Sequence, residues 1–170
     1  MSTSIPIPEE QLVSELWARD VRFLMGRQIN PTPLLAPTNL ITSLAQSENA
    51  RVRLSLIPLF LRHPEFSTEA EKADKALSSK FSQNVLRFYY TAAVFLQMKY
   101  QERLHKIFGE QNQLPNLFSR KLGLLSDKDS NQNLLELAKR HQIMSGHIIN
   151  WLGTYEHAAE RLIKHMEKFK

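Results

Sequence analysis

The sequence predicts an all-α fold, a single-domain irregular bundle of about six or seven helices. Only 5 of the 170 residues are glycine, whereas sheet-rich folds need more glycine in their tight turns. Apolar residues recur at three- and four-residue spacing along most of the chain, which is the pattern of helices with one buried face. A chain of this length usually forms one compact domain. We therefore expect residues 1–170 to form a single helical domain, with residues 1–7 as a loose leader.

The first helix is expected to begin at Pro8, because the first helical position does not need the N–H that proline lacks. Its apolar periodicity continues to Leu24, so we expect the helix to end near Gly26. Prolines then exclude regular structure from Ile29 to Pro37. A short helix is predicted from Thr38.

The segment Ser47–Phe66 is predicted to contain a buried helix with an almost entirely apolar surface. Pro58 must kink or split it, because proline removes one backbone hydrogen bond and clashes with the preceding turn. Pro64 ends it. Its arginines lie at or near its ends and are expected to reach solvent through their long stems; they are Arg51, Arg53 and Arg62.

Ser67 is predicted to cap a helical region that runs to Phe108 without proline or glycine, with a break around Ser78–Ser82. A loop is expected from Gly109 to Ser130. Ser130 is then expected to cap a helix that Gly146 ends.

The last predicted helix runs from Ile148 to Lys170 and carries a narrow apolar seam of alternating four- and three-residue steps. Its members are Ile148, Leu152, Tyr155, Ala159, Leu162, Met166 and Phe169. We expect this helix to pack on a bundle, and the seam to support dimerisation only if it is exposed.

Composition restricts the class of protein. The chain has no cysteine, which excludes disulfides, thiolate zinc sites and cysteine nucleophiles. No apolar run reaches the length of a membrane span, and the first residues lack the features of a signal peptide. We therefore expect a soluble, cytoplasmic protein without a membrane partner. The formal net charge of +5 and the pI of about 9.6 favour nucleic acid weakly, because the charge is spread along the chain.

No cofactor and no metal site is predicted. The phosphate-binding loops, dinucleotide fingerprints, nucleophile elbows and H-E-x-x-H motifs are all missing from the sequence. His157 and His165 flank Arg161 at four-residue spacing. Because a cation between two histidines opposes metal binding, both are interpreted as surface residues.

Arg140 and His147 form one candidate catalytic pair, in the stretch RHQIMSGH. This stretch resembles the R-x(4–6)-H signature of HEPN domains, which are all-helical and often act as metal-independent ribonucleases. The resemblance implies that Arg140 stabilises phosphate charge and that His147 moves a proton. The sequence departs from the family pattern at His141, where a polar residue is common, and Gly146 places the motif across a helix end.

The arginines of Ser47–Phe66 leave other interpretations open. The segment resembles half of a HEAT repeat, although no second copy follows. It also resembles the entry helix of a winged-helix regulator, although no recognition helix is apparent after it. A nucleic-acid-binding regulator would use Arg51, Arg53 and Arg62, while a kinked core helix is the plainer interpretation.

Trp151, Tyr155 and His157 form a candidate pocket rim or interface around Gly153, for which close helix packing is the expected reason. The function predicted first is a non-catalytic helical module that binds another protein or a second copy of itself. A HEPN-like ribonuclease and a nucleic-acid-binding regulator are the alternatives.

Overall fold

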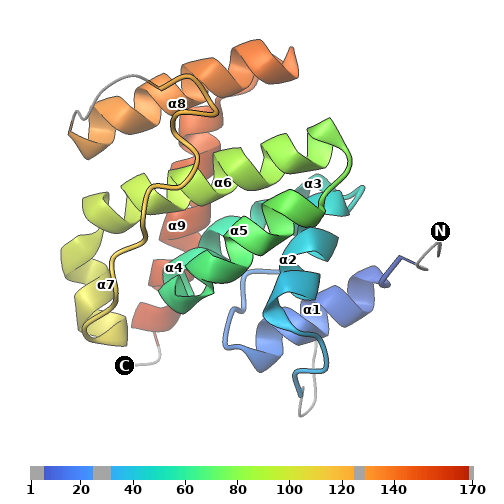
Figure 1. The fold of residues 1–170 in the computed structure, drawn as a ribbon. Helices are drawn as coiled ribbons and strands as arrows, with labels where there is room; N and C mark the ends of the chain where they lie inside the picture. Colours follow the sequence, from blue (N-terminus) through green and yellow to red (C-terminus); the bar gives the residue numbers. More distant parts are fainter. Residues whose placement is uncertain (1–5, 25–31, 125–128, 169–170) are drawn as a thin grey trace.

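The computed structural model describes residues 6–24, 32–124 and 129–168. All the regular structure within these residues is helical, and the helices pack into one arrangement, so the predicted all-α class is confirmed (Figure 1). The described residues form helices α1 to α9 and one short 3-10 helix. A single residue separates α3 from α4, and a single residue separates α6 from α7. If each of these pairs is counted as one broken helix, the number of helices in the described residues is close to the expected six or seven.

The first half of the described chain contains α1 Glu9–Ala18, α2 Pro37–Gln46, α3 Ala50–Leu54, α4 Leu56–Arg62, the 3-10 helix Pro64–Phe66 and α5 Ser67–Ala76. The second half contains α6 Lys80–Lys99, α7 Gln101–Phe108, α8 Ser130–Ser145 and α9 Trp151–Glu167. Ile7 packs against the core. Residues 1–5 of the expected leader lie outside the described residues.

Helix α1 ends earlier than the expected boundary near Gly26, which itself lies outside the described residues. Asp20 follows the helix with a φ of 62°, a left-handed conformation that aspartate tolerates better than most residues. The N–H of Asp20 donates to the carbonyl of Trp17, and the N–H of Val21 donates to that of Leu16. This paired closure is a Schellman motif. The apolar pattern continues beyond the end of the helix because Val21, Phe23 and Leu24 are also buried in the core.

Pro58 splits its helical segment as predicted. The break lies at Ser55, between α3 and α4, and places Pro58 in the first turn of α4, where a missing N–H is tolerated. Two predicted caps were displaced by one residue. Ser67 is the first residue of α5, and the side chain of Asp129, rather than Ser130, accepts the N–H of Gln132 at the start of α8.

Helix α6 runs through the middle of the molecule, with α8 above it and α9 passing behind it in Figure 1. It contacts α2, α4, α5, α7, α8 and α9. Tyr90 of α6 is fully buried; its ring meets Phe60 edge-on at 4.9 Å, and its hydroxyl donates to the carbonyl of Pro115. Because neighbouring helices enclose α6 in this way, every residue from Phe88 to Gln97 is buried.

The apolar seam of the last helix lies largely inside the monomer. Tyr155, Ala159 and Leu162 are buried, and α9 contacts α4, α6, α7 and α8. Ile148 precedes α9 and is not part of its buried face, whereas Phe169 lies outside the described residues. The three buried members of the seam are therefore not available as a surface for dimerisation.

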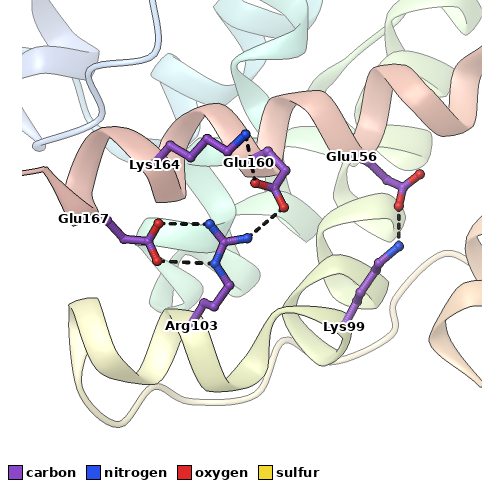
Figure 2. A network of polar contacts seen from close by, with 6 residues as sticks. All are labelled: Lys99, Arg103, Glu156, Glu160, Lys164 and Glu167. Atoms are coloured by element: carbon purple, nitrogen blue, oxygen red, sulfur yellow. Dashed lines mark hydrogen bonds and ion pairs between the residues drawn. The ribbon is translucent and has the colours of Figure 1, made fainter.

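Charged side chains fix α9 against α6 and α7 (Figure 2). Arg103 donates to Glu160 at 2.7 Å and grips Glu167 through two nitrogens, at 2.9 and 3.3 Å. Lys99 pairs with Glu156. The hydrogen bonds from Arg103 lower the pKa of Glu167, and the bond to Glu167 raises the pKa of Arg103. These ion pairs set the position of α9 and hence of the residues that precede it.

Candidate interaction surface

The connection between α8 and α9 forms a tight corner whose two ends are both capped. Gly146 ends α8 with a φ of 73°, and its N–H donates to Gln142 at 3.0 Å. At the other end, the side-chain oxygen of Asn150 accepts the N–H of Gly153 at 2.9 Å and starts α9. Because helix-ending and helix-starting residues lie only four positions apart, the residues between them cannot join the buried face of either helix.

The corner carries apolar side chains that face solvent. It lies where the deeper orange end of α8 reaches the periphery of the molecule in Figure 1. We define the corner patch as Ile143, Met144, Ile148 and Ile149, which are 70%, 37%, 91% and 46% exposed. Four such residues within seven positions are a local concentration, and grouped exposed apolar side chains on a soluble protein often mark a binding surface.

The corner patch rests on a stack of buried rings. His141 lies between Phe88 and Trp151, with ring centroids 4.2 and 3.6 Å away. Its Nδ1 atom lies 2.6 Å from the hydroxyl of Tyr155. Tyr89 meets the rings of His141 and Tyr155 edge-on. These rings join α6, α8 and α9 and thereby connect the two helices on either side of the corner.

Burial determines the protonation of this stack. It lowers the pKa of His141 to about 3 and raises the pKa of Tyr155 well above its usual value. At neutral pH the imidazole is therefore neutral and the phenol keeps its proton, so the pair shares one neutral hydrogen bond. Such a histidine suits structural support, because it exchanges no proton in the physiological range.

The charge of the corner is of one sign. No aspartate or glutamate occurs from Leu137 to Tyr155, whereas Lys139, Arg140 and His147 do, and all three are exposed. Lys139 and Arg140 therefore give the end of α8 beside the apolar patch a positive charge.

Arg140 also has a structural role. Its Nε donates to the carbonyl of Leu122 at 2.9 Å, and a Cβ added at Gly123 would lie 3.1 Å from its guanidinium. Arg140 thus holds the preceding loop against α8. His147 stands in the corner, with its backbone N–H donating to Ser145. The two residues of the HEPN-like motif therefore lie on opposite sides of a helix end, one on α8 and one in the connection.

The candidate rim of Trp151, Tyr155 and His157 does not share one surface. Tyr155 is fully buried in the ring stack, Trp151 is half-buried above it, and His157 is exposed. Gly153 was expected to allow close packing of helices. Instead, a Cβ at this position would lie 2.7 Å from the amide nitrogen of Asn150, so the glycine leaves room for the capping side chain.

The arginines of α3 and α4 have partners within the chain. Arg53 donates to the carbonyl of Ser47 and lies over the ring of Phe81. Arg62 lies 3.7 Å from Asp20 and covers Phe108 at 4.5 Å. Arg51 is exposed at the start of α3. The side chains of Arg53 and Arg62 are thus held in different local contacts.

Two open grooves with mixed polar and apolar linings lie elsewhere on the described residues. One groove of about 680 Å³ lies between α6, α7 and residues 109–113, and one of about 960 Å³ lies between α1 and α2. No group of three or more His, Cys, Asp or Glu in the described residues is arranged to hold a metal ion. Among the described helices, none combines the length and apolar character that crossing a bilayer requires.

The corner patch was missed by sequence reasoning because Ile148 was assigned to the seam of the last helix. A signal for it was present: Gly146 favours a helix end, and asparagine at position 150 is a preferred helix cap. Comparison of the chain with protein-family models, with curated proteins and with solved structures found no match.

Proposed function

We propose that this chain is a non-catalytic interaction module that binds a protein partner through the corner patch. The observation that carries the proposal is the exposure of Ile148 and Ile143 in a corner whose two ends are capped. Complete burial of one isoleucine side chain gains about 1.5–3 kcal/mol. The patch therefore offers enough apolar surface to anchor a partner, and the capped corner holds it ready for binding.

The ring stack supports this proposal over a catalytic role for the same region. His141 is the histidine nearest the centre of the stack, and burial keeps it neutral. Its two faces are covered by Phe88 and Trp151, so a substrate has no route to the imidazole. The lack of cysteine supports a reducing compartment, and we include the cytoplasm in the proposal on that ground.

Capture from the native host tests the proposal. The full-length tagged chain is compared with its Ile148→Asp and Leu34→Asp variants, and the captured proteins are identified by mass spectrometry. Leu34 is a matched control because it is 77% exposed and lies before α2. A partner held by the wild type and Leu34→Asp but lost by Ile148→Asp supports the proposal. Equal capture by all three proteins, or capture of nothing, contradicts it.

A further inference from the structure

The backbone of the corner limits what can cover the patch. Ile148 is 91% exposed, and neither its N–H nor its carbonyl is bonded to any other residue that the structure describes. Irregular backbone of this kind is not found facing the hydrocarbon of a bilayer, since each unpaired polar group there costs several kcal/mol. A protein surface can supply the missing donors and acceptors, so the corner is better matched to a protein than to a lipid surface.

The charge of the corner also disfavours a second copy of the chain. A twofold interface brings the same patch of both subunits together, which would place Lys139 and Arg140 of one subunit against those of the other. Like charges brought together at an interface are repulsive. A binding partner that carries negative charge would match the positive charge of the corner better than a second copy of the chain does.

The form of the corner indicates the form of the occupant. Nearly every residue from Gln142 to Asn150 is exposed, and the end of α8 lies at the periphery of the molecule (Figure 1). An apolar side chain that projects from a surface contributes most to the binding free energy when it enters a recess, because water is then excluded from all its sides.

We infer that the corner patch inserts into an apolar recess of a protein partner whose rim carries aspartate and glutamate. This inference rests on the proposed function and deepens it by stating the chemistry of the partner. Ile148 and Ile143 fill the recess, while Lys139 and Arg140 face the acidic rim.

A selection from a displayed library of small folded domains with randomised concave surfaces tests the inference. The full chain serves as bait, and domains are kept if they bind the wild type but not Ile148→Asp. The randomised positions of the selected domains are expected to combine apolar residues with aspartate and glutamate more often than the starting library does. Their affinity is expected to fall about fivefold in Lys139→Glu and to weaken with added salt. Leu34→Asp is the control and should leave the affinity unchanged.

Three results would overturn the inference. Selected domains that are neutral or basic, or that bind Lys139→Glu equally well, would remove the acidic rim but keep a protein-binding patch. Co-sedimentation with phosphatidylserine vesicles that Ile148→Asp abolishes would assign the patch to a lipid surface instead. A dimer in analytical ultracentrifugation that Ile148→Asp dissociates would assign it to a second copy. If no domain distinguishes the wild type from Ile148→Asp, the inference also fails, while the capture experiment decides the proposed function separately.

Discussion

The imidazole of His141 stacks on the indole of Trp151 with their ring centroids 3.6 Å apart, and this contact joins the end of α8 to the first residue of α9. The exposed corner lies between these two residues in the sequence. The same contact therefore closes the corner and removes a histidine from solvent. The position of the corner patch and the acid stability of the protein therefore both involve one buried side chain, that of His141.

The first prediction concerns acid stability. Folding lowers the pKa of His141 from its usual 6.5 to about 3, so the unfolded state binds more protons between these values. The stabilisation is complete above pH 6.5 and is lost as the pH falls towards 3. Between pH 7 and 4.5, this single group should cost the fold about 2–3 kcal/mol.

Urea unfolding at both pH values measures this loss. The reference is the double variant His141→Phe with Tyr155→Phe, which keeps the stack and leaves neither partner of the buried hydrogen bond unpaired. The double variant should lose less stability on acidification than the wild type. Equal losses would show that His141 is protonated in the folded protein at pH 4.5.

The second prediction concerns Gly153. In Gly153→Ala, the new Cβ collides with the side chain of Asn150, so the cap of α9 should be lost at a cost of about 1 kcal/mol. This cost should roughly cancel the gain of up to about 1 kcal/mol that alanine brings as the better helix former. In an Asn150→Ala background there is no cap to lose, so the same change should show the full gain. Thermal unfolding of the four proteins measures both effects. Equal stabilisation in both backgrounds would contradict the account.

The third prediction concerns the ion pairs of α9. Arg103→Ala should lower the melting temperature, because it removes the contacts with Glu160 and Glu167. The difference from the wild type should shrink as salt is added, since these carboxylates are partly exposed and their attraction is screened. Lys72→Ala, on the exposed face of α5, is the control and should show little change. A salt-independent difference would mean that packing of the arginine stem dominates.

The fourth prediction concerns Arg140. Arg140→Met keeps the apolar stem but leaves the carbonyl of Leu122 without its donor, which should cost about 1 kcal/mol. The neighbouring exposed residue gives a control, Lys139→Met, which should stay within about 0.5 kcal/mol of the wild type. Chemical unfolding measures both. Equal effects would show that the guanidinium does not hold the loop against α8.

Helical periodicity predicted most of the fold. The all-α class, the split caused by Pro58 and the helix end at Gly146 follow from local rules of backbone geometry, and the structure agrees with them. The end of α1 could not be predicted in this way. Asp20 adopts a left-handed conformation that aspartate takes only in some contexts, while the apolar pattern continued past it.

The candidate site was harder to predict for a related reason. Periodicity identifies apolar residues but not the element that buries them, so Ile148 was counted with Tyr155 although only Tyr155 lies in the core. In the sequence, His141 was seen only as a departure from a catalytic motif. Its burial depends on Phe88, which belongs to a helix far away in the sequence but adjacent in space. Contacts between segments far apart in the sequence decided both outcomes.

The most direct test of the central claim is a calorimetric titration of the captured partner into the wild type, Ile148→Asp and Leu34→Asp. The account predicts that Ile148→Asp weakens the affinity at least about tenfold, because a buried isoleucine contributes at least about 1.5 kcal/mol, while Leu34→Asp binds like the wild type. Unchanged affinity in Ile148→Asp would show that the corner between α8 and α9 is not the binding surface.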